Sequence, residues 1–152
     1  MILNIVKLYL DNCCYNRPYD DQSQLRISLE TQAKLQIQST IKEGKIKLVS
    51  SYVLLYENSK NPHEIRKRTI YSFIKENIDT FVYADIADKV KEKADAIIET
   101  GVKTVDSYHI ACAIISKSDY FITTDDRVLK YKTNEIKILD PIQFIKEMEE
   151  IL

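Results

Sequence analysis

Four acidic residues stand where an α/β fold would bring them together, and their chemistry suggests a metal site. Asp11 directly follows an apolar run, and Asp125 follows the residues FIT. Glu57 lies almost two turns into one predicted helix, and Asp106 lies in the first turn of another. Clustered carboxylates repel one another unless a cation neutralises them, and carboxylate-only ligands favour Mg²⁺ or Mn²⁺ over Zn²⁺. Such ions at an open site suit the hydrolysis of phosphodiester bonds.

Each acid also has a structural interpretation when it is taken alone. Asp106 could stabilise a helix start, and Asp11 could open an Asx-turn. Asp125 or Asp126 could cap a short helix, and Glu57 could be a solvated side chain. The convergence of four separate segments is what favours a functional site over these separate roles.

The elements that position these acids alternate along the chain. Apolar runs predict strands at 2–10, 45–50, 80–84, 119–123 and 136–140. Apolar periodicity and capping residues predict helices at about 25–41, 51–60, 61–77, 84–101, 102–118, 125–131 and 141–152. Segment 11–22 is predicted as a loop, with Asp20 or Asp21 capping the next helix, and Asn61 should begin a helix with Pro62 in its first turn. This alternation indicates an α/β sandwich whose parallel strands end at one ligand-binding edge.

Composition limits the classes of protein to consider. A chain of 152 residues predicts one domain, and a formal net charge of −1 gives no global basic field that would hold nucleic acid. Three cysteines, two of them adjacent, do not suggest a disulfide framework or a zinc site. No apolar run is long enough for a membrane span, and the apolar start lacks the features of a signal peptide, so we expect a cytoplasmic protein with no membrane partner.

Several motifs match a known family in order and spacing over nearly the whole chain. They are YLDN at 9–12, Glu57 in SSYVLLYE, VDSYHIACA at 105–113, YFITTDD at 120–126 and IKILDPIQFI at 136–145. By these motifs the chain resembles PIN-domain ribonucleases, and among them the small standalone toxins of the VapC type. The most specific part is VDSYHIACA followed by FITTDD.

The resemblance implies a fold, an activity and partners. The expected fold is a single PIN domain over 1–152, a three-layer α/β sandwich with a five-stranded, mainly parallel sheet in the order 3-2-1-4-5. The expected activity is metal-dependent endoribonuclease cleavage of RNA, in a toxin held in check by an antitoxin protein. The expected assembly is a homodimer.

The resemblance also implies roles for the acids. Asp11 and Asp106 would be the main direct ligands of Mg²⁺ or Mn²⁺. Glu57 would bind through a water molecule or orient one. Asp125 would complete the site for a second metal, with its neighbour Asp126 as the alternative fourth acid.

Four further residues are candidates for supporting the site or touching substrate. Asn12 could position Asp11, and Thr123 could hydrogen-bond either Asp11 or a metal-bound water. Arg17 has two interpretations held evenly, contact with a phosphate or a salt bridge to Asp20 or Asp21. Arg127 could meet a backbone phosphate, although a solvated position is the commoner role.

Two other features of the sequence bear on the site. His109 follows Asp106 by one helical turn and is predicted to be a buried, hydrogen-bonded histidine rather than a general base. Arg66, Lys67 and Arg68 are the best local cluster for attracting RNA, unless they form a plain solvated helix face.

Two competing functions remain. A non-catalytic scaffold with the same fold, binding RNA or protein, would need a broken acidic set, and the set is intact. A phosphatase of the haloacid dehalogenase type also has an aspartate after its first strand, but it needs a second one two residues later, where Cys13 stands.

Overall fold

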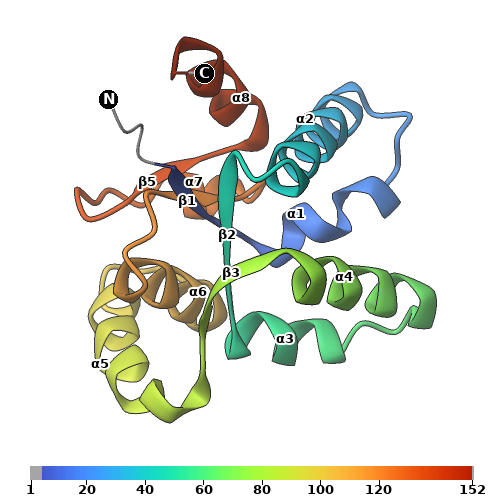
Figure 1. Ribbon diagram of the computed structural model, residues 1–152. Helices are drawn as coiled ribbons and strands as arrows, with labels where there is room; N and C mark the ends of the chain where they lie inside the picture. The colour runs from blue at the N-terminus through green and yellow to red at the C-terminus, as the bar shows by residue number, and fades with distance from the viewer. Residues whose placement is uncertain (1–4, 152) are drawn as a thin grey trace.

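The computed structural model describes residues 5–151, in which five parallel strands form one sheet between helical layers (Figure 1). The strands are β1 (Val6–Leu10), β2 (Ile46–Ser51), β3 (Ile78–Val82), β4 (Tyr120–Ile122) and β5 (Lys137–Leu139). They lie in the order β3-β2-β1-β4-β5, and every neighbouring pair is parallel. The predicted fold class and strand order are confirmed.

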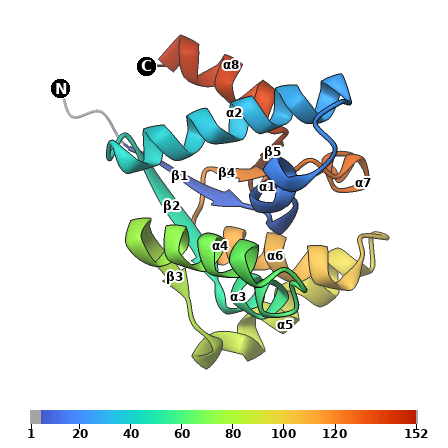
Figure 2. The ribbon, with the colours of Figure 1, turned by 90° about the vertical axis from the view of Figure 1, so that its right-hand side faces the viewer.

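Helices cover both faces of the sheet. They are α1 (Asn12–Asn16), α2 (Leu25–Lys42), α3 (Tyr52–Ser59), α4 (Glu64–Asn77), α5 (Ala87–Ile98), α6 (Thr104–Ile115), α7 (Asp126–Leu129) and α8 (Pro141–Ile151). Figures 1 and 2 show α2 and α8 on one face, with α5 and α6 on the other. Among residues 5–151, none of these helices has the length and apolar character needed to cross a membrane.

The central strands are apolar on both faces because both faces are covered. Leu8, Leu10, Leu48, Phe121 and Ile122 are all completely buried. Close packing on two sides makes these strands a rigid frame. Residues at their carboxyl ends are therefore held in defined positions.

The segment after β1 corrects the prediction of a loop. Asp11 accepts the N–H of Asn12, which starts the short helix α1, and a 3₁₀ turn follows at Arg17–Tyr19. The predicted cap of α2 is also wrong, since α2 begins at Leu25. The Asp21 carboxylate instead accepts the N–H and the hydroxyl of Ser23.

Other boundaries differ by a few residues. The predicted first strand included residues 2–4, which lie outside the described part of the chain, and β1 begins at Val6. Helix α4 begins at Glu64 rather than Asn61, because the Asn61 carboxamide accepts the N–H of His63 in a turn. The strand expected at 80–84 is β3, two residues earlier, and a separate 3₁₀ turn at Ala84–Ile86 precedes α5.

Candidate metal centre

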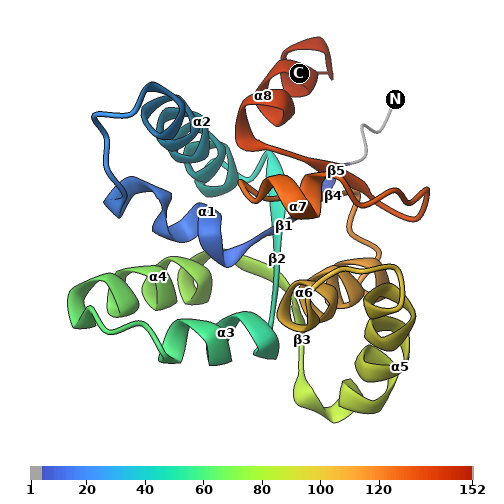
Figure 3. The same cartoon turned by 180° about the vertical axis from the view of Figure 1, so that it is seen from behind.

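Acidic residues from four elements lie around the carboxyl edge of the sheet, which faces the viewer in Figure 3. Asp11 follows the last residue of β1, and Asp125 directly precedes α7. Glu57 lies in the second turn of α3, which Ser51 caps by accepting the N–H of Leu54. Asp106 lies in the first turn of α6. The edge therefore receives the acids from the elements that the sequence predicted.

Asp11 is held through both of its carboxylate oxygens. Oδ1 accepts the backbone N–H of Asn12 and Oδ2 accepts the hydroxyl of Thr123, each at 2.8 Å. Thr123 is fully buried, and its Oγ1 also accepts the N–H of Asp125 at 3.1 Å. Thr123 therefore hydrogen-bonds Asp11, which is one of its two predicted roles. Because Thr123 is fully buried, it cannot contact a substrate directly.

Glu57 is positioned by a buried chain of hydrogen bonds. His109 Nε2 lies 2.8 Å from Glu57 Oε1 and donates to it, and His109 Nδ1 lies 2.7 Å from the Tyr9 hydroxyl. The Tyr9 hydroxyl in turn lies 2.6 Å from Ser51 Oγ. Burial opposes protonation of His109, but the bond to Glu57 and the charge of Asp11 outweigh it and raise the pKa of His109. The chain ties one carboxylate of the site to the core.

Removing the Tyr9 hydroxyl should destabilise the protein. We expect Tyr9→Phe to lower the free energy of unfolding by about 1–3 kcal/mol, because His109 Nδ1 and Ser51 Oγ would lose their buried partner. Chemical denaturation measures the change. Tyr56→Phe removes the same atom from a side chain that is 65% exposed and should have almost no effect. Equal losses in the two variants would show that the buried chain contributes nothing.

The pKa of Asp106 is raised by the electrostatic repulsion between neighbouring acids. Burial, followed by the charges of Asp11 and Asp125, raises the pKa of Asp106 to about 6. Glu57 adds to the rise, while His109 opposes it. A cation at this edge would remove the repulsion, so the electrostatics of the edge fit a divalent metal.

The raised pKa predicts a pH dependence of metal binding. Below about pH 6 a proton occupies Asp106 and competes with the metal, so affinity for Mn²⁺ should fall as pH falls through that value. For one displaced proton we expect little change above pH 6.5 and a loss of about fourfold by pH 5.5, approaching tenfold per pH unit only at lower pH. Calorimetric titrations at pH 7.5, 6.5 and 5.5 measure it, and an affinity that stays constant between pH 7.5 and 5.5 would contradict it.

In the part of the chain that the structure describes, Asp11 and Glu57 lie close enough to share one ion, and Asp106 and Asp125 are not in the same close group. Among the described residues, a ligand atom each from Asp11, Glu57 and His109 lie within 4.8 Å of one another. The prediction that His109 is a buried, hydrogen-bonded histidine is confirmed, because its Nε2 donates to Glu57 and its Nδ1 bonds to the Tyr9 hydroxyl. Its position one turn after Asp106 puts both side chains on one face of α6.

The geometry separates the two candidates for the fourth acid. Asp125 accepts the N–H of Arg127 at 2.9 Å, and its charge acts on Asp106. Asp126 instead forms an ion pair with Arg26 at 2.7 Å on the exposed surface, which lowers the pKa of Asp126. The structure therefore favours Asp125 over Asp126.

Arg17 forms salt bridges with two acidic residues, Glu30 and Asp20. Its NH2 atom lies 2.6 Å from Oε1 of Glu30, and its NH1 atom lies 3.1 Å from Oδ2 of Asp20. Glu30 is only 1% exposed and Arg17 only 18%. This arrangement corrects the predicted contact of Arg17 with substrate in favour of the salt bridge, with Glu30 as a partner that the sequence did not suggest.

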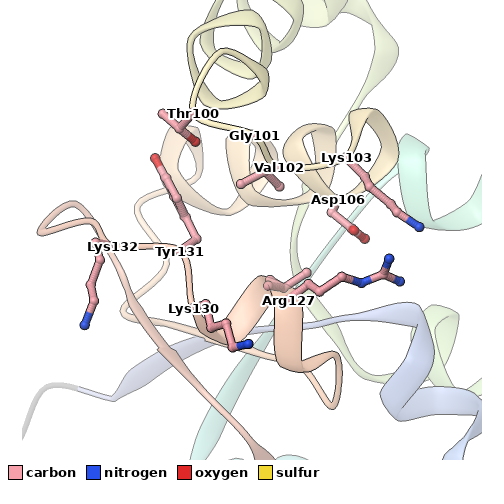
Figure 4. A pocket seen from close by; sticks show the side chains of 10 residues that line it. Thr100, Gly101, Val102, Lys103, Asp106, Arg127, Lys130, Tyr131 and Lys132 are labelled. Carbon is pink, nitrogen blue, oxygen red and sulfur yellow. The ribbon is translucent and has the colours of Figure 1, made fainter.

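The two remaining candidates for substrate contact, Asn12 and Arg127, differ in how exposed their side chains are. Asn12 lies half-buried beside Asp11, and its amide oxygen accepts from Asn16 at 3.3 Å. Arg127 is 70% exposed, and its Nε lies 3.7 Å from Asp125. Figure 4 shows the Arg127 side chain extended beneath Asp106. Of these two, Arg127 is free to contact a ligand.

The basic residues Arg66, Lys67 and Arg68 of α4 all contact side chains of the protein itself. Lys67 and Arg68 both form ion pairs with Glu64, at 3.2 Å each. The guanidinium of Arg66 lies over the ring of Tyr19, 4.5 Å from its centroid. These contacts support the solvated-helix interpretation of the cluster.

The strand order and the helices on both faces define an α/β sandwich. No family model and no curated protein matches the chain. Its fold is similar to that of a chain in the crystal structure of VapBC2 from Rickettsia felis bound to a DNA fragment from their promoter. The TM-score is 0.55 at 10% sequence identity, and the match covers 88% of this chain and 97% of that chain.

Proposed function

We propose that the protein is a cytoplasmic, metal-dependent endoribonuclease that hydrolyses RNA phosphodiester bonds. The observations that support this proposal are the closeness of Asp11 and Glu57, whose ligand atoms lie within 4.8 Å of one another, and the pKa of Asp106, which the charges of Asp11, Asp125 and Glu57 help to raise to about 6. Such repulsion is relieved when a divalent cation binds, and oxygen donors suit Mg²⁺ or Mn²⁺.

Each acid then has a role in holding the metal. Asp11, which Asn12 and Thr123 fix in place, and Asp106 are the proposed direct ligands. Glu57, held by His109, orients a water molecule at the site. Asp125 would help to hold a second metal ion. When bound, the cation lowers the pKa of an attacking water and neutralises charge on the phosphorane-like transition state.

The proposal extends to partners. We propose that the protein is a toxin, that an antitoxin protein inhibits it and that it forms a homodimer. The support is the similarity of fold to a chain of VapBC2, together with the motifs at 9–12 and 105–113.

Cleavage of a mixed RNA pool tests the proposed activity. Purified protein should cut RNA with Mn²⁺ or Mg²⁺, and EDTA should abolish the cutting. Asp11→Asn should also be inactive, with circular dichroism to show that it is folded. A folded wild-type protein that neither cuts RNA nor binds metal would overturn the proposal and favour a binding scaffold.

A further inference from the structure

A basic cavity extends from the acidic edge between the start of α6 and the segment that follows α7. Its volume is about 550 Å³, within the range of pockets that hold small ligands. The charged and aromatic residues that line it are Lys103, Asp106, Arg127, Lys130, Tyr131 and Lys132. Asp106 thus belongs both to the acidic site and to this cavity.

The cations of this cavity are less neutralised than those of α4. Lys103, Lys130 and Lys132 are exposed, and in the described part of the chain no carboxylate oxygen lies within 4.0 Å of their Nζ atoms. Arg127 has only a 3.7 Å contact with Asp125. The lining thus holds four cations and one carboxylate, and the charge of Lys130 also acts on Asp126 outside it. The remaining excess of positive charge attracts anions to a protein whose net charge is −1.

The charges are spread along the cavity rather than gathered at one point. Figure 4 shows Lys103, Asp106 and Arg127 together at one end and Lys132 at the other, with Tyr131 between them. A single phosphate would use one end only. An elongated polyanion that begins at the acidic site would meet cations along its whole path.

The walls between the cations are apolar and aromatic. Val102 and Val128 contribute aliphatic surface, and the ring of Tyr131 is half-buried in the lining. Aromatic rings beside a cationic path are the combination with which proteins bind single-stranded nucleic acid, because bases stack while phosphates pair with cations. An acidic peptide would use the charges but not this ring.

We propose that this cavity binds the stretch of single-stranded RNA next to the bond that is cut. Lys103 and Arg127 contact the phosphate nearest the acids, Tyr131 stacks on a base, and Lys130 and Lys132 contact phosphates farther along. The inference rests on the proposed ribonuclease function. It specifies on which side of the acidic site the RNA strand lies.

Salt-dependent binding tests the charged part of the cavity. The probe is a fluorescent ten-nucleotide single-stranded RNA in EDTA, titrated with full-length protein between 50 and 200 mM salt. Lys103→Gln/Lys130→Gln/Lys132→Gln should bind at least about tenfold more weakly at 50 mM salt, and its log–log salt slope should be smaller by about 2, at about 0.7 per lost phosphate contact. Lys47→Gln/Lys89→Gln/Lys146→Gln removes three exposed lysines elsewhere and should match the wild type.

A second variant and a second probe identify the ligand. Tyr131→Leu keeps an apolar side chain and should weaken RNA binding about tenfold through lost stacking, with little change in the salt slope. Poly-glutamate should be unaffected by Tyr131→Leu. Equal losses for RNA and poly-glutamate in that variant would show a general anion site and overturn the assignment to RNA.

The outcomes separate this inference from the nuclease proposal. If the wild type cuts RNA while the cavity and control triple variants bind it equally well, the cavity assignment is wrong and the nuclease stands. If the cavity variant binds weakly but the wild type cuts no RNA, the cavity is an RNA-binding site, and the nuclease proposal and the placement beside a cleaved bond both fail. No RNA binding by the wild type would overturn the cavity assignment.

Discussion

Asp106→Asn is expected to abolish metal-dependent RNA cleavage while leaving the fold intact. Metal ions contribute several kcal/mol of transition-state stabilisation, and about 1.4 kcal/mol corresponds to a tenfold change in rate. Loss of a direct ligand should therefore lower the rate by at least about 10²-fold. Gel-based cleavage of the RNA pool with Mn²⁺ measures the rate.

The same substitution should stabilise the protein in the absence of metal. The pKa of Asp106 is raised, so ionisation of this carboxyl destabilises the native state at neutral pH. Asp106→Asn should raise the free energy of unfolding at pH 7 by about 0.5–1 kcal/mol, since solvent screens the half-buried site. The gain should shrink as pH falls through about 6, where wild-type Asp106 takes up a proton.

Asp88→Asn is the matched control for both measurements. Asp88 also lies in the first turn of a helix, α5, but it is exposed and lies in a different element from the four acids. Cleavage should be unchanged in this variant. Full cleavage by Asp106→Asn, or equal effects of the two substitutions, would remove Asp106 from the proposed site.

Arg17→Ala is expected to lower the free energy of unfolding by about 3 kcal/mol. The substitution would leave Glu30, which is 1% exposed, as a buried carboxylate without its main partner, and breaking a buried pair in this way costs about 3–5 kcal/mol. Arg26 lies 3.4 Å from Glu30 Oε2 and keeps part of the pairing, so the lower end is expected. Urea denaturation measures the loss.

Arg68→Ala provides the comparison for an exposed pair. Arg68 is 75% exposed and pairs with Glu64, so its loss should change stability by about 1 kcal/mol or less. Adding Glu30→Gln to Arg17→Ala should recover part of the loss, because it removes the unpaired charge. An Arg17→Ala protein as stable as Arg68→Ala, with weaker RNA binding, would instead support the phosphate contact.

The fold was accessible from the sequence because its strands are apolar runs that only a covered parallel sheet can bury. Ser51 and Asp125 act as helix caps whose residue type and position could be recognised in advance. The acids at the carboxyl edge followed from the same topology. Helix α1, which follows Asp11, was not predicted. A helix of five residues is too short to show an apolar period, and its start depends on the cap that Asp11 provides.

The residues that support the site were harder to predict because their partners are distant in sequence. Local spacing pointed to Asp20 or Asp21, and the Arg17–Asp20 pair is present. The additional partner Glu30 meets Arg17 only after α2 packs beside α1. The contact of His109 with Glu57 joins α6 to α3, and the contact with Tyr9 joins α6 to β1. Such pairs depend on tertiary packing and have no local signature.

The central claim is that Asp11, Glu57, Asp106 and Asp125 form a metal centre. Calorimetric titration of the wild-type protein with Mn²⁺ at pH 7.5 is the most direct test of this claim. We expect saturable binding, and at a Mn²⁺ concentration of about 100 times Kd the free energy of unfolding should rise by about 2.7 kcal/mol. Asp106→Asn should bind far more weakly, and Asp88→Asn should match the wild type. A folded wild-type protein that binds no Mn²⁺, or an Asp106→Asn variant that binds it equally well, would contradict the claim.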